Sequence, residues 1–305
     1  MLSHTLVILS DFALILVGLV LARAWPKAFD RAFWTGAEKL VYYVLFPALL
    51  FNAINSASFS LTTDLVTLGV AVGAFLVAVA AGFAARPMLK PAPEVFASSV
   101  QTAFRYNSYI GLALAQSLFG ARGVALLALI ISVCVPLANL FAVFALARHA
   151  ERGLAKELAT NPLIIGTVAG LVTNLLGWPM PGIVQNLLGR LGGASLALGL
   201  LCIGAGLTLA AVQSQRLVLG YFSAVKLLLF PAVALALITV AGLRGVPAQV
   251  LMLFAALPTA SSAYVLAARM GGNAAPVAFV VTLQTVLAML TLPVWLATAQ
   301  ALTAR

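Results

Sequence analysis

The chain has 305 residues, of which 63% are hydrophobic and only 8% are charged, and its mean hydropathy is +1.13. This composition excludes a soluble globular domain and a disordered chain, and it is typical of an integral membrane protein. The formal net charge is +10. The basic residues are few and lie between apolar segments, so they indicate orientation at a lipid surface and not a nucleic-acid interface.

Apolar segments of about 20 residues recur along the chain, and each is long enough to cross a hydrocarbon layer of about 30 Å. Short polar or Gly/Pro-rich stretches separate them. We predict ten membrane-spanning helices, at residues 3–24, 33–56, 63–85, 94–120, 121–148, 161–178, 184–212, 217–243, 248–270 and 274–301. The first segment has no basic start and no small-residue cleavage site, so we expect it to remain as the first span.

The distribution of Lys and Arg predicts the orientation of these spans. If the N-terminus is outside, eleven of the seventeen basic residues lie on the inner side, four lie on the outer side and two lie within spans. Loops on the cytoplasmic side carry the excess of basic residues in membrane proteins. We therefore expect a multi-pass protein of the bacterial inner (cytoplasmic) membrane with both termini outside.

The second half of the sequence echoes the first. The segment Val-Gly-Leu-Val at 17–20 recurs as Ala-Gly-Leu-Val at 169–172, and residues 108–110 are echoed by residues 263–265. Five spans in each half is an odd number, so the two halves must enter the bilayer from opposite faces. This pattern predicts one transporter domain made of two inverted five-helix repeats, 1–150 and 151–305.

Two polar segments interrupt the apolar pattern at a matching depth. Arg105 lies eleven residues after Glu94, and Pro258 lies eleven residues after Pro247. At 1.5 Å per residue, each lies about 16 Å below its own membrane face. Proline removes a helical hydrogen bond, and non-helical backbone at this depth must line a protein-filled or watery cavity. We predict that helices four and nine are interrupted and cross near the midplane of the bilayer.

Arg105 is the most unusual residue of the chain, because its guanidinium stays protonated within an apolar span. A charge at the centre of a membrane helix costs about 2.5–3.5 kcal/mol on insertion scales. One interpretation is that Arg105 binds a carboxylate through its planar fork of N–H groups. The alternative is that it caps carbonyls of a broken helix or pairs with a buried acid.

Polar and aromatic residues around the two interruptions are further candidates for a binding site. For the tyrosines the alternative is helix packing, and for the serines it is hydrogen bonding to the local backbone. The predicted substrate-binding residues are Arg105, Tyr106, Asn107, Ser108, Tyr109, Pro258, Thr259, Ser261, Ser262 and Tyr264.

Asn52, Asp11 and Lys226 are candidates for coupling or gating, since they also place polar groups inside spans. Asp11 and Lys226 as a pair would relay protons; the alternative is a structural role for each, including an interhelical hydrogen bond of Asn52. Cys134 and Cys202 lack the spacing of a metal site or a disulfide framework. We therefore expect no metal site and no cofactor, apart from a proton or sodium as coupling ion.

In four stretches the chain resembles the auxin efflux carrier family, which includes bacterial permeases related to the plant PIN-formed carriers. These stretches are residues 39–51, 104–112, 202–207 and 258–267. The resemblance implies the ten-helix fold of the bile-acid sodium symporters, in which helices four and nine cross at the substrate site and a mobile core moves against a scaffold. It also implies organic anions as cargo, among them malonate, malate and auxin.

The sequence departs from the family pattern in its fourth span. The plant carriers have a proline between asparagines there, whereas this chain reads Arg105-Tyr106-Asn107. Many bacterial relatives read Gly-Leu-Pro where this chain has residues 111–113, Gly-Leu-Ala. The resemblance therefore leaves open whether the fourth helix is broken.

The expected function is secondary active transport of a small organic anion, such as a mono- or dicarboxylate, by alternating access. An enzyme is not expected, because the sequence has no cluster of His, Asp and Glu typical of catalysis. The alternatives are a sodium-coupled symporter of the bile-acid type and a membrane protein that transports nothing. The expected partners are the anion and the lipid bilayer, with no nucleic acid; a homodimer is one option for the assembly.

Overall fold

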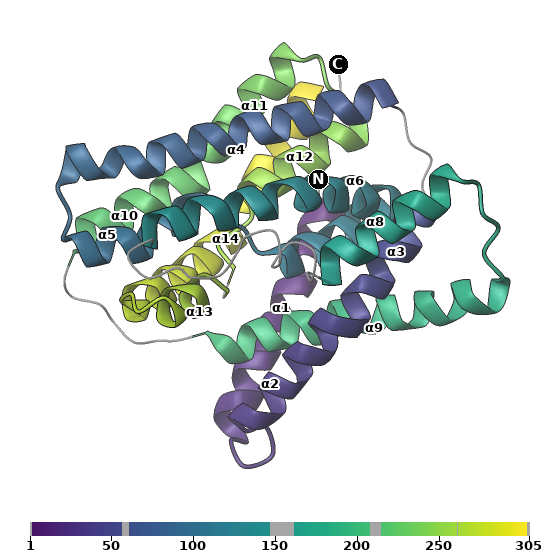
Figure 1. Cartoon of the computed structure of the whole chain (residues 1–305), viewed down its shortest axis with the longest axis horizontal. Helices are drawn as coiled ribbons and strands as arrows, with labels where there is room; N and C mark the ends of the chain where they lie inside the picture. The colour runs from purple at the N-terminus through teal and green to yellow at the C-terminus, as the bar shows by residue number, and fades with distance from the viewer. Residues whose placement is uncertain (1, 57–60, 147–161, 208–214, 261, 304–305) are drawn as a thin grey trace. The chain divides into compact units, whose positions relative to one another are not determined.

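A computed structural model describes residues 2–56, 61–146, 162–207, 215–260 and 262–303 (Figure 1). These residues form helices and no strand, so the predicted all-α class is confirmed for them. In chain order the elements are α1 (Leu2–Ala24), α2 (Arg31–Leu40), η1 (Val41–Leu45), α3 (Phe46–Asn55), α4 (Leu61–Leu89), α5 (Pro93–Ser99), η2 (Val100–Ala103), α6 (Ser108–Leu146), α8 (Pro162–Leu175), α9 (Gly182–Gly206), α10 (Arg216–Ala224), η3 (Val225–Leu229), α11 (Phe230–Val240), α12 (Gly245–Ala256), α13 (Ser262–Arg269) and α14 (Ala274–Thr303).

Several helices are long and apolar enough to cross a membrane. Within the described ranges there are six of them: Arg31–Asn55, Thr62–Leu89, Pro93–Leu146, Gly182–Gly206, Arg216–Val240 and Ala274–Thr303. Three shorter apolar helices occur at Phe12–Ala24, Ile165–Leu175 and Gly245–Ala256. The protein is therefore a multi-pass membrane protein. One long stretch, Pro93–Leu146, covers both the fourth and the fifth predicted span, and the ten-helix inverted repeat stays a prediction.

A kink in α6 separates the fourth and fifth predicted spans. Gly120 has φ 61° and ψ −155°, which is not a helical conformation. Residues other than glycine rarely adopt this positive φ, so the glycine permits the chain to change direction inside an otherwise continuous helix. The two predicted spans nearly touch in the sequence because this single residue joins them.

The chain divides into two compact units. The first comprises Met1–Ser60, Tyr109–Ser132 and Gly153–Gly206, and the second comprises Leu61–Ser108, Val133–Arg152 and Leu207–Arg305. Each unit draws on both halves of the sequence. The units are therefore not the same division as the predicted repeats 1–150 and 151–305, which no observation on this structure tests.

Glycine brings two helices of the first unit into backbone contact. A Cβ atom placed on Gly18 of α1 would overlap the carbonyl of Leu201, and one placed on Gly204 of α9 would overlap the carbonyl of Ile15. Helix α3 packs in the same way against glycines of α8 and α9. Small residues at such crossings allow close van der Waals packing, which holds membrane helices together where lipid removes the hydrophobic driving force.

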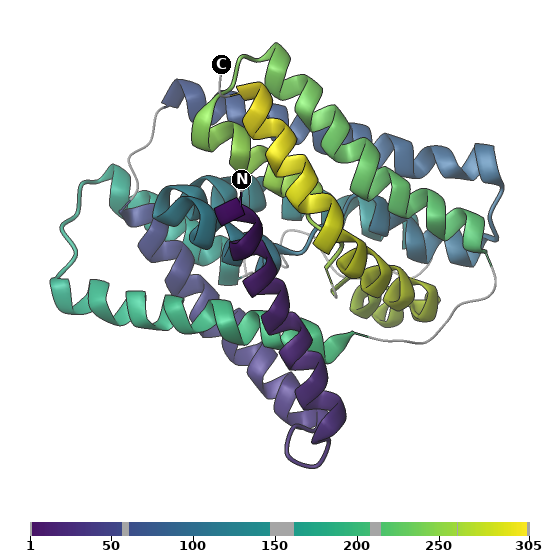
Figure 2. The same cartoon turned by 180° about the vertical axis from the view of Figure 1, so that it is seen from behind.

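The second unit packs around α12 and α14. Helix α4 lies beside α11 and contacts α12, and α14 contacts both α12 and α13 (Figures 1 and 2). Phe104 is fully buried in this unit, and its ring meets the ring of Phe75 edge-on at a centroid distance of 5.9 Å. This anchor fixes the backbone directly before Arg105.

The tetrapeptide Leu-Phe-Pro-Ala occurs at 45–48 and again at 229–232. In both copies the leucine is the last residue of a π-helical turn. Proline has no N–H, so the regular helical ladder is interrupted at this point. In the second copy the N–H of Phe230 bonds to the carbonyl of Val225, five residues back, which is the π-helical pattern. The resulting turn, η3, carries Lys226 into the interior of the second unit.

Candidate functional site

The fourth predicted helix is interrupted although it contains no proline. It runs from α5 into the 3₁₀ turn η2, and residues 104–107 are not helical. The amide of Gln101 donates to the carbonyl of Ser98 at 2.9 Å, and the hydroxyl of Thr102 donates to that of Ser99 at 2.7 Å. Such local bonds compete with the helical ladder. The side-chain hydrogen bonds of Gln101 and Thr102 therefore favour a break in this helix, as a proline does in other helices.

The ninth predicted helix is interrupted at the expected proline. Helix α12 ends at Ala256, and residues 257–260 are not helical. Leu257, directly before Pro258, has φ −60° and ψ 141°, because the proline ring disfavours a helical conformation of the preceding residue. The candidate Ser261 lies outside the described residues.

The two interruptions are hydrogen-bonded to each other within the second unit. The backbone N–H of Asn107 donates to the carbonyl of Pro258 at 2.8 Å. The hydroxyl of Thr259 lies 2.9 Å from the carbonyl of Thr102 and 3.3 Å from that of Arg105, and it donates to these two acceptors. The interrupted segments of the two sequence halves therefore meet.

Gln284 of α14 joins the two interruptions, and the sequence analysis did not identify it. Its side chain is fully buried. Its Oε1 accepts the backbone N–H of Thr259 at 3.1 Å, and its Nε2 donates to the carbonyl of Thr102 at 3.1 Å. The available signal was an amide in the middle of an apolar span, which must find a partner because lipid offers none.

Arg105 projects from the first interruption toward the start of α13. Its Nη2 donates to the hydroxyl of Ser262, the first residue of that helix, at 3.1 Å. Its Nη1 lies 3.5 Å from Oε1 of Gln101. Arg105 as a residue is partly exposed, and its charge lies at the interrupted segments.

The residues that follow Arg105 have different surroundings. Tyr106 is buried with its ring edge-on to Phe254 at 4.7 Å, and its hydroxyl has no hydrogen-bond partner within the part of the chain that the structure describes. Asn107 is buried, whereas Ser108 is partly exposed at the start of α6. The sequence prediction treated these residues as one set. In the structure Tyr106 and Asn107 are buried, whereas Ser108 is accessible.

The predicted tyrosines 109 and 264 both pack against apolar neighbours. The ring of Tyr109 lies 4.6 Å from that of Phe46, and both residues belong to the first unit. Tyr264 is partly buried against a small cluster of α13 and α14 that includes Ala263 and Val277. These contacts agree with the packing alternative, and a role in binding remains a prediction for both.

Of the predicted coupling residues, Lys226 has the clearest environment. It is fully buried, its Nζ donates to the carbonyl of Ala255 at 3.1 Å, and it lies 4.2 Å from the ring centroid of Phe230. Asn52 is partly buried in α3 of the first unit. Asp11 lies in α1, with its side chain outside the described part of the chain, so its predicted pairing with Lys226 stays a prediction.

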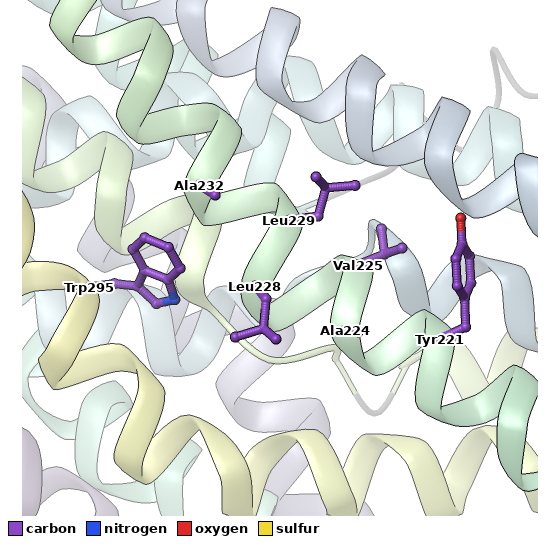
Figure 3. A pocket seen from close by; sticks show the side chains of 7 residues that line it. All are labelled: Tyr221, Ala224, Val225, Leu228, Leu229, Ala232 and Trp295. Carbon is purple, nitrogen blue, oxygen red and sulfur yellow. The ribbon is translucent and has the colours of Figure 1, made fainter.

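An open apolar groove of about 490 Å³ lies beside η3, and Figure 3 shows the side chains that line it. Its lining residues are Tyr221, Ala224, Val225, Leu228, Leu229, Ala232 and Trp295, none of them charged. Leu228 is 54% exposed, whereas Lys226 of the same turn is fully buried. The groove therefore lies on another face of the turn than Lys226 and has no charged side chain in its lining.

The structure also bears on metal binding. Within the described ranges, no group of three or more His, Cys, Asp or Glu side chains is placed to hold a metal ion. Cys134 and Cys202 are buried free cysteines. The candidate site therefore consists of a guanidinium, hydroxyls, amides and backbone groups.

Long apolar helices make the chain a multi-pass membrane protein, and Arg105 lies at two hydrogen-bonded helix interruptions within it. Comparison with known proteins agrees: residues 146–296 match the family model described as membrane transport protein. This match covers the second half of the chain, and it confirms the resemblance to the auxin efflux carriers.

Two relatives align along nearly the whole chain. A protein of Methanothermobacter thermautotrophicus named "Uncharacterized transporter" is 25% identical over 299 residues, which cover 96% of this chain and 97% of the relative. A protein of Rhizobium meliloti (strain 1021) named "Putative malonate transporter" is 26% identical over 286 residues, covering 87% of this chain and 86% of the relative.

Proposed function

We propose that the protein is a secondary active transporter for a small organic anion, a mono- or dicarboxylate, in the cytoplasmic membrane. The observation that carries this proposal is the guanidinium of Arg105, held at two bonded helix interruptions by Ser262 and Gln101. A permanent charge is costly inside a membrane span unless a partner or water compensates it. An anionic substrate provides that compensation and, unlike a structural acid, can leave.

The polarity of the helix ends supports an anion. The first N–H groups of a helix lack internal partners and carry a partial positive charge, and the last carbonyls carry a partial negative one. Helix α13 begins at Ser262, beside the guanidinium, and α6 begins at Ser108, three residues after Arg105. At the opposite, negative ends, donors of Thr259 and Gln284 already bond to the carbonyl of Thr102.

A carboxylate is the anion that best fits these groups. The planar fork of arginine matches a carboxylate in a bidentate arrangement, and the hydroxyl of Ser262 adds a donor close by. The relative named "Putative malonate transporter" supports a short dicarboxylate as the cargo. We take malonate as the first substrate to test.

The proposed mechanism is alternating access in a ten-helix fold of two inverted repeats. The division of the chain into two compact units, each built from both sequence halves, supports a carrier made of two bodies. Substrate binding at the interruptions and movement of one body would then expose the site to either side of the membrane in turn.

The test is malonate binding to the detergent-purified protein, measured by isothermal titration calorimetry. We expect Arg105→Ala to weaken binding at least tenfold, because a hydrogen-bonded charge pair contributes about 1.5–3 kcal/mol. Arg105→Lys keeps the charge but loses the planar fork, so its affinity should lie between those of the wild type and the alanine variant.

Arg86→Ala is the matched control, because Arg86 is an exposed arginine in α4 of the same unit. This variant should bind malonate with wild-type affinity. Equal malonate affinity in Arg105→Ala and the wild type would remove the anion-binding role of Arg105. If the wild type bound no mono- or dicarboxylate at all, the proposed cargo class would be wrong.

A further inference from the structure

The interruption of α12 creates a negative helix end inside the second unit. The last carbonyls of a helix have no internal N–H partner, and the end carries about half a negative charge. In secondary transporters with interrupted helices, such half-helix ends and unwound carbonyls coordinate the coupling cation. The end of α12, at Ala255 and Ala256, is separated from Pro258 by Leu257 alone.

In this chain a side chain already lies at that negative end. Nζ of Lys226 donates to the carbonyl of Ala255 at 3.1 Å, and the face of Phe230 lies 4.2 Å from it. A carbonyl oxygen and an aromatic face are both groups that stabilise a cation. Lys226 is fully buried, and these two groups contact its ammonium there.

We propose that the ammonium group of Lys226 is a built-in cation at the C-terminal end of α12, where it takes the place of a coupling sodium ion. Substrate binding therefore needs no sodium. This inference concerns how transport at the same site is coupled to an ion. The statement about substrate binding rests on the proposed function, whereas the statement about the Lys226 ammonium does not. Lys226 therefore favours sodium-independent transport over the sodium-coupled alternative.

The position of Lys226 also ties it to the anion-binding segment. The ring of Phe230 meets that of Phe254 edge-on at 5.5 Å, and Phe254 in turn meets Tyr106 at 4.7 Å. Three residues after Ala255, the carbonyl of Pro258 accepts the N–H of Asn107. A cation at the end of α12 therefore holds the backbone to which the Arg105 segment is bonded.

A lysine that only fills space would give the same packing, so the test must separate charge from volume. Lys226→Met keeps most of the length and removes the charge. Lys226→Ala removes both and leaves room at the helix end for a small cation. The probes are sodium and methylammonium, with choline as the cation too large to enter.

The first measurement uses the wild type. Its thermal unfolding midpoint without substrate, and its affinity for malonate, should be the same in sodium chloride and choline chloride, within 1 °C and twofold respectively. An increase of either quantity with sodium would overturn the inference, because the helix end would then still accept sodium.

The second measurement uses ligand-free Lys226→Ala. Its unfolding midpoint in choline chloride should fall by about 5 °C or more, and sodium or methylammonium should restore at least half of the loss in a saturable manner. Lys226→Met should not respond to either cation, because its side chain fills the space. A Lys226→Ala protein that responds to no cation would overturn the proposal.

Two further points keep these outcomes distinct. If Lys226→Ala cannot be purified in choline, purification in methylammonium chloride decides: recovery of folded protein there supports the inference, and failure there contradicts it. The ligand-free unfolding assay does not depend on malonate. Loss of the proposed cargo would therefore leave the test of the cation site valid.

Discussion

At the scale of single residues, the site is a set of polar groups whose partners come from distant parts of the chain. Thr259, Gln284 and Thr102 form a closed hydrogen-bonded group, and all three are fully buried. An unpaired donor or acceptor in such surroundings costs about 1–3 kcal/mol. The network therefore fixes the backbone that carries Arg105, a residue that is itself partly exposed.

Gln284→Met tests this network. The substitution keeps the side-chain length but leaves the N–H of Thr259 without its acceptor and removes one donor from the carbonyl of Thr102. We expect a loss of about 2–4 kcal/mol in the free energy of unfolding, measured by denaturant titration in detergent. Thr298→Val is the control, because its exposed hydroxyl bonds only within its own helix, and it should change stability by less than about 0.5 kcal/mol.

The sequence identified Arg105, Pro258 and Thr259, because a charge or a helix breaker inside an apolar span is unusual by itself. It did not identify Gln284, although this residue contacts both interruptions. A single glutamine in an apolar span shows that a partner is needed but not which one. The hydrogen bond of Lys226 to the carbonyl of Ala255 could not be predicted either, because every residue has a backbone carbonyl and the sequence does not show which one is used.

At the scale of helices, local chemistry accounts for the shapes of several elements. The interruption before α6 needs no proline, because the side chains of Gln101 and Thr102 bond to carbonyls of the preceding turn. The repeated Leu-Phe-Pro-Ala sequence gives a π turn in both places where it occurs. The resemblance to the family left open whether the helix before α6 is interrupted. The structure shows the interruption, and side-chain hydrogen bonds of Gln101 and Thr102 account for it.

Gly204→Ala tests the crossing of α1 and α9. The added Cβ would overlap the carbonyl of Ile15, so the helices must move apart and lose packing along the crossing. We expect a loss of about 1–3 kcal/mol of stability, measured as a lower unfolding midpoint in detergent. Gly193→Ala in the same helix has nothing within 4 Å of the new Cβ and should be neutral or slightly stabilising, by up to about 1 kcal/mol. Equal effects of the two substitutions would contradict the packing role of Gly204.

At the scale of the whole molecule, both compact units combine segments from the two sequence halves. The apolar pattern predicted the helices closely, because the length of a membrane span restricts where each can begin and end. It could not predict which helices join which unit, since that depends on contacts such as those at Gly18 and Gly204. The inverted repeat and the orientation remain predictions at this scale.

The predicted orientation can be tested with reporters at the C-terminus. Because basic residues are concentrated in the predicted inner loops, an alkaline phosphatase fused after Arg305 should be active in a bacterial host. A green fluorescent protein at the same place should remain dark. If the green fluorescent protein fusion were fluorescent and the phosphatase fusion inactive, the C-terminus would lie inside and the predicted orientation would be wrong.

We propose that Arg105, at the interlocked interruptions, binds a carboxylate during transport. The most direct measurement is counterflow of labelled malonate in proteoliposomes loaded with unlabelled malonate. The wild type and Arg86→Ala should accumulate label transiently, and Arg105→Ala should lose at least nine-tenths of this flux while folding normally. Wild-type flux in the Arg105→Ala protein would contradict the claim.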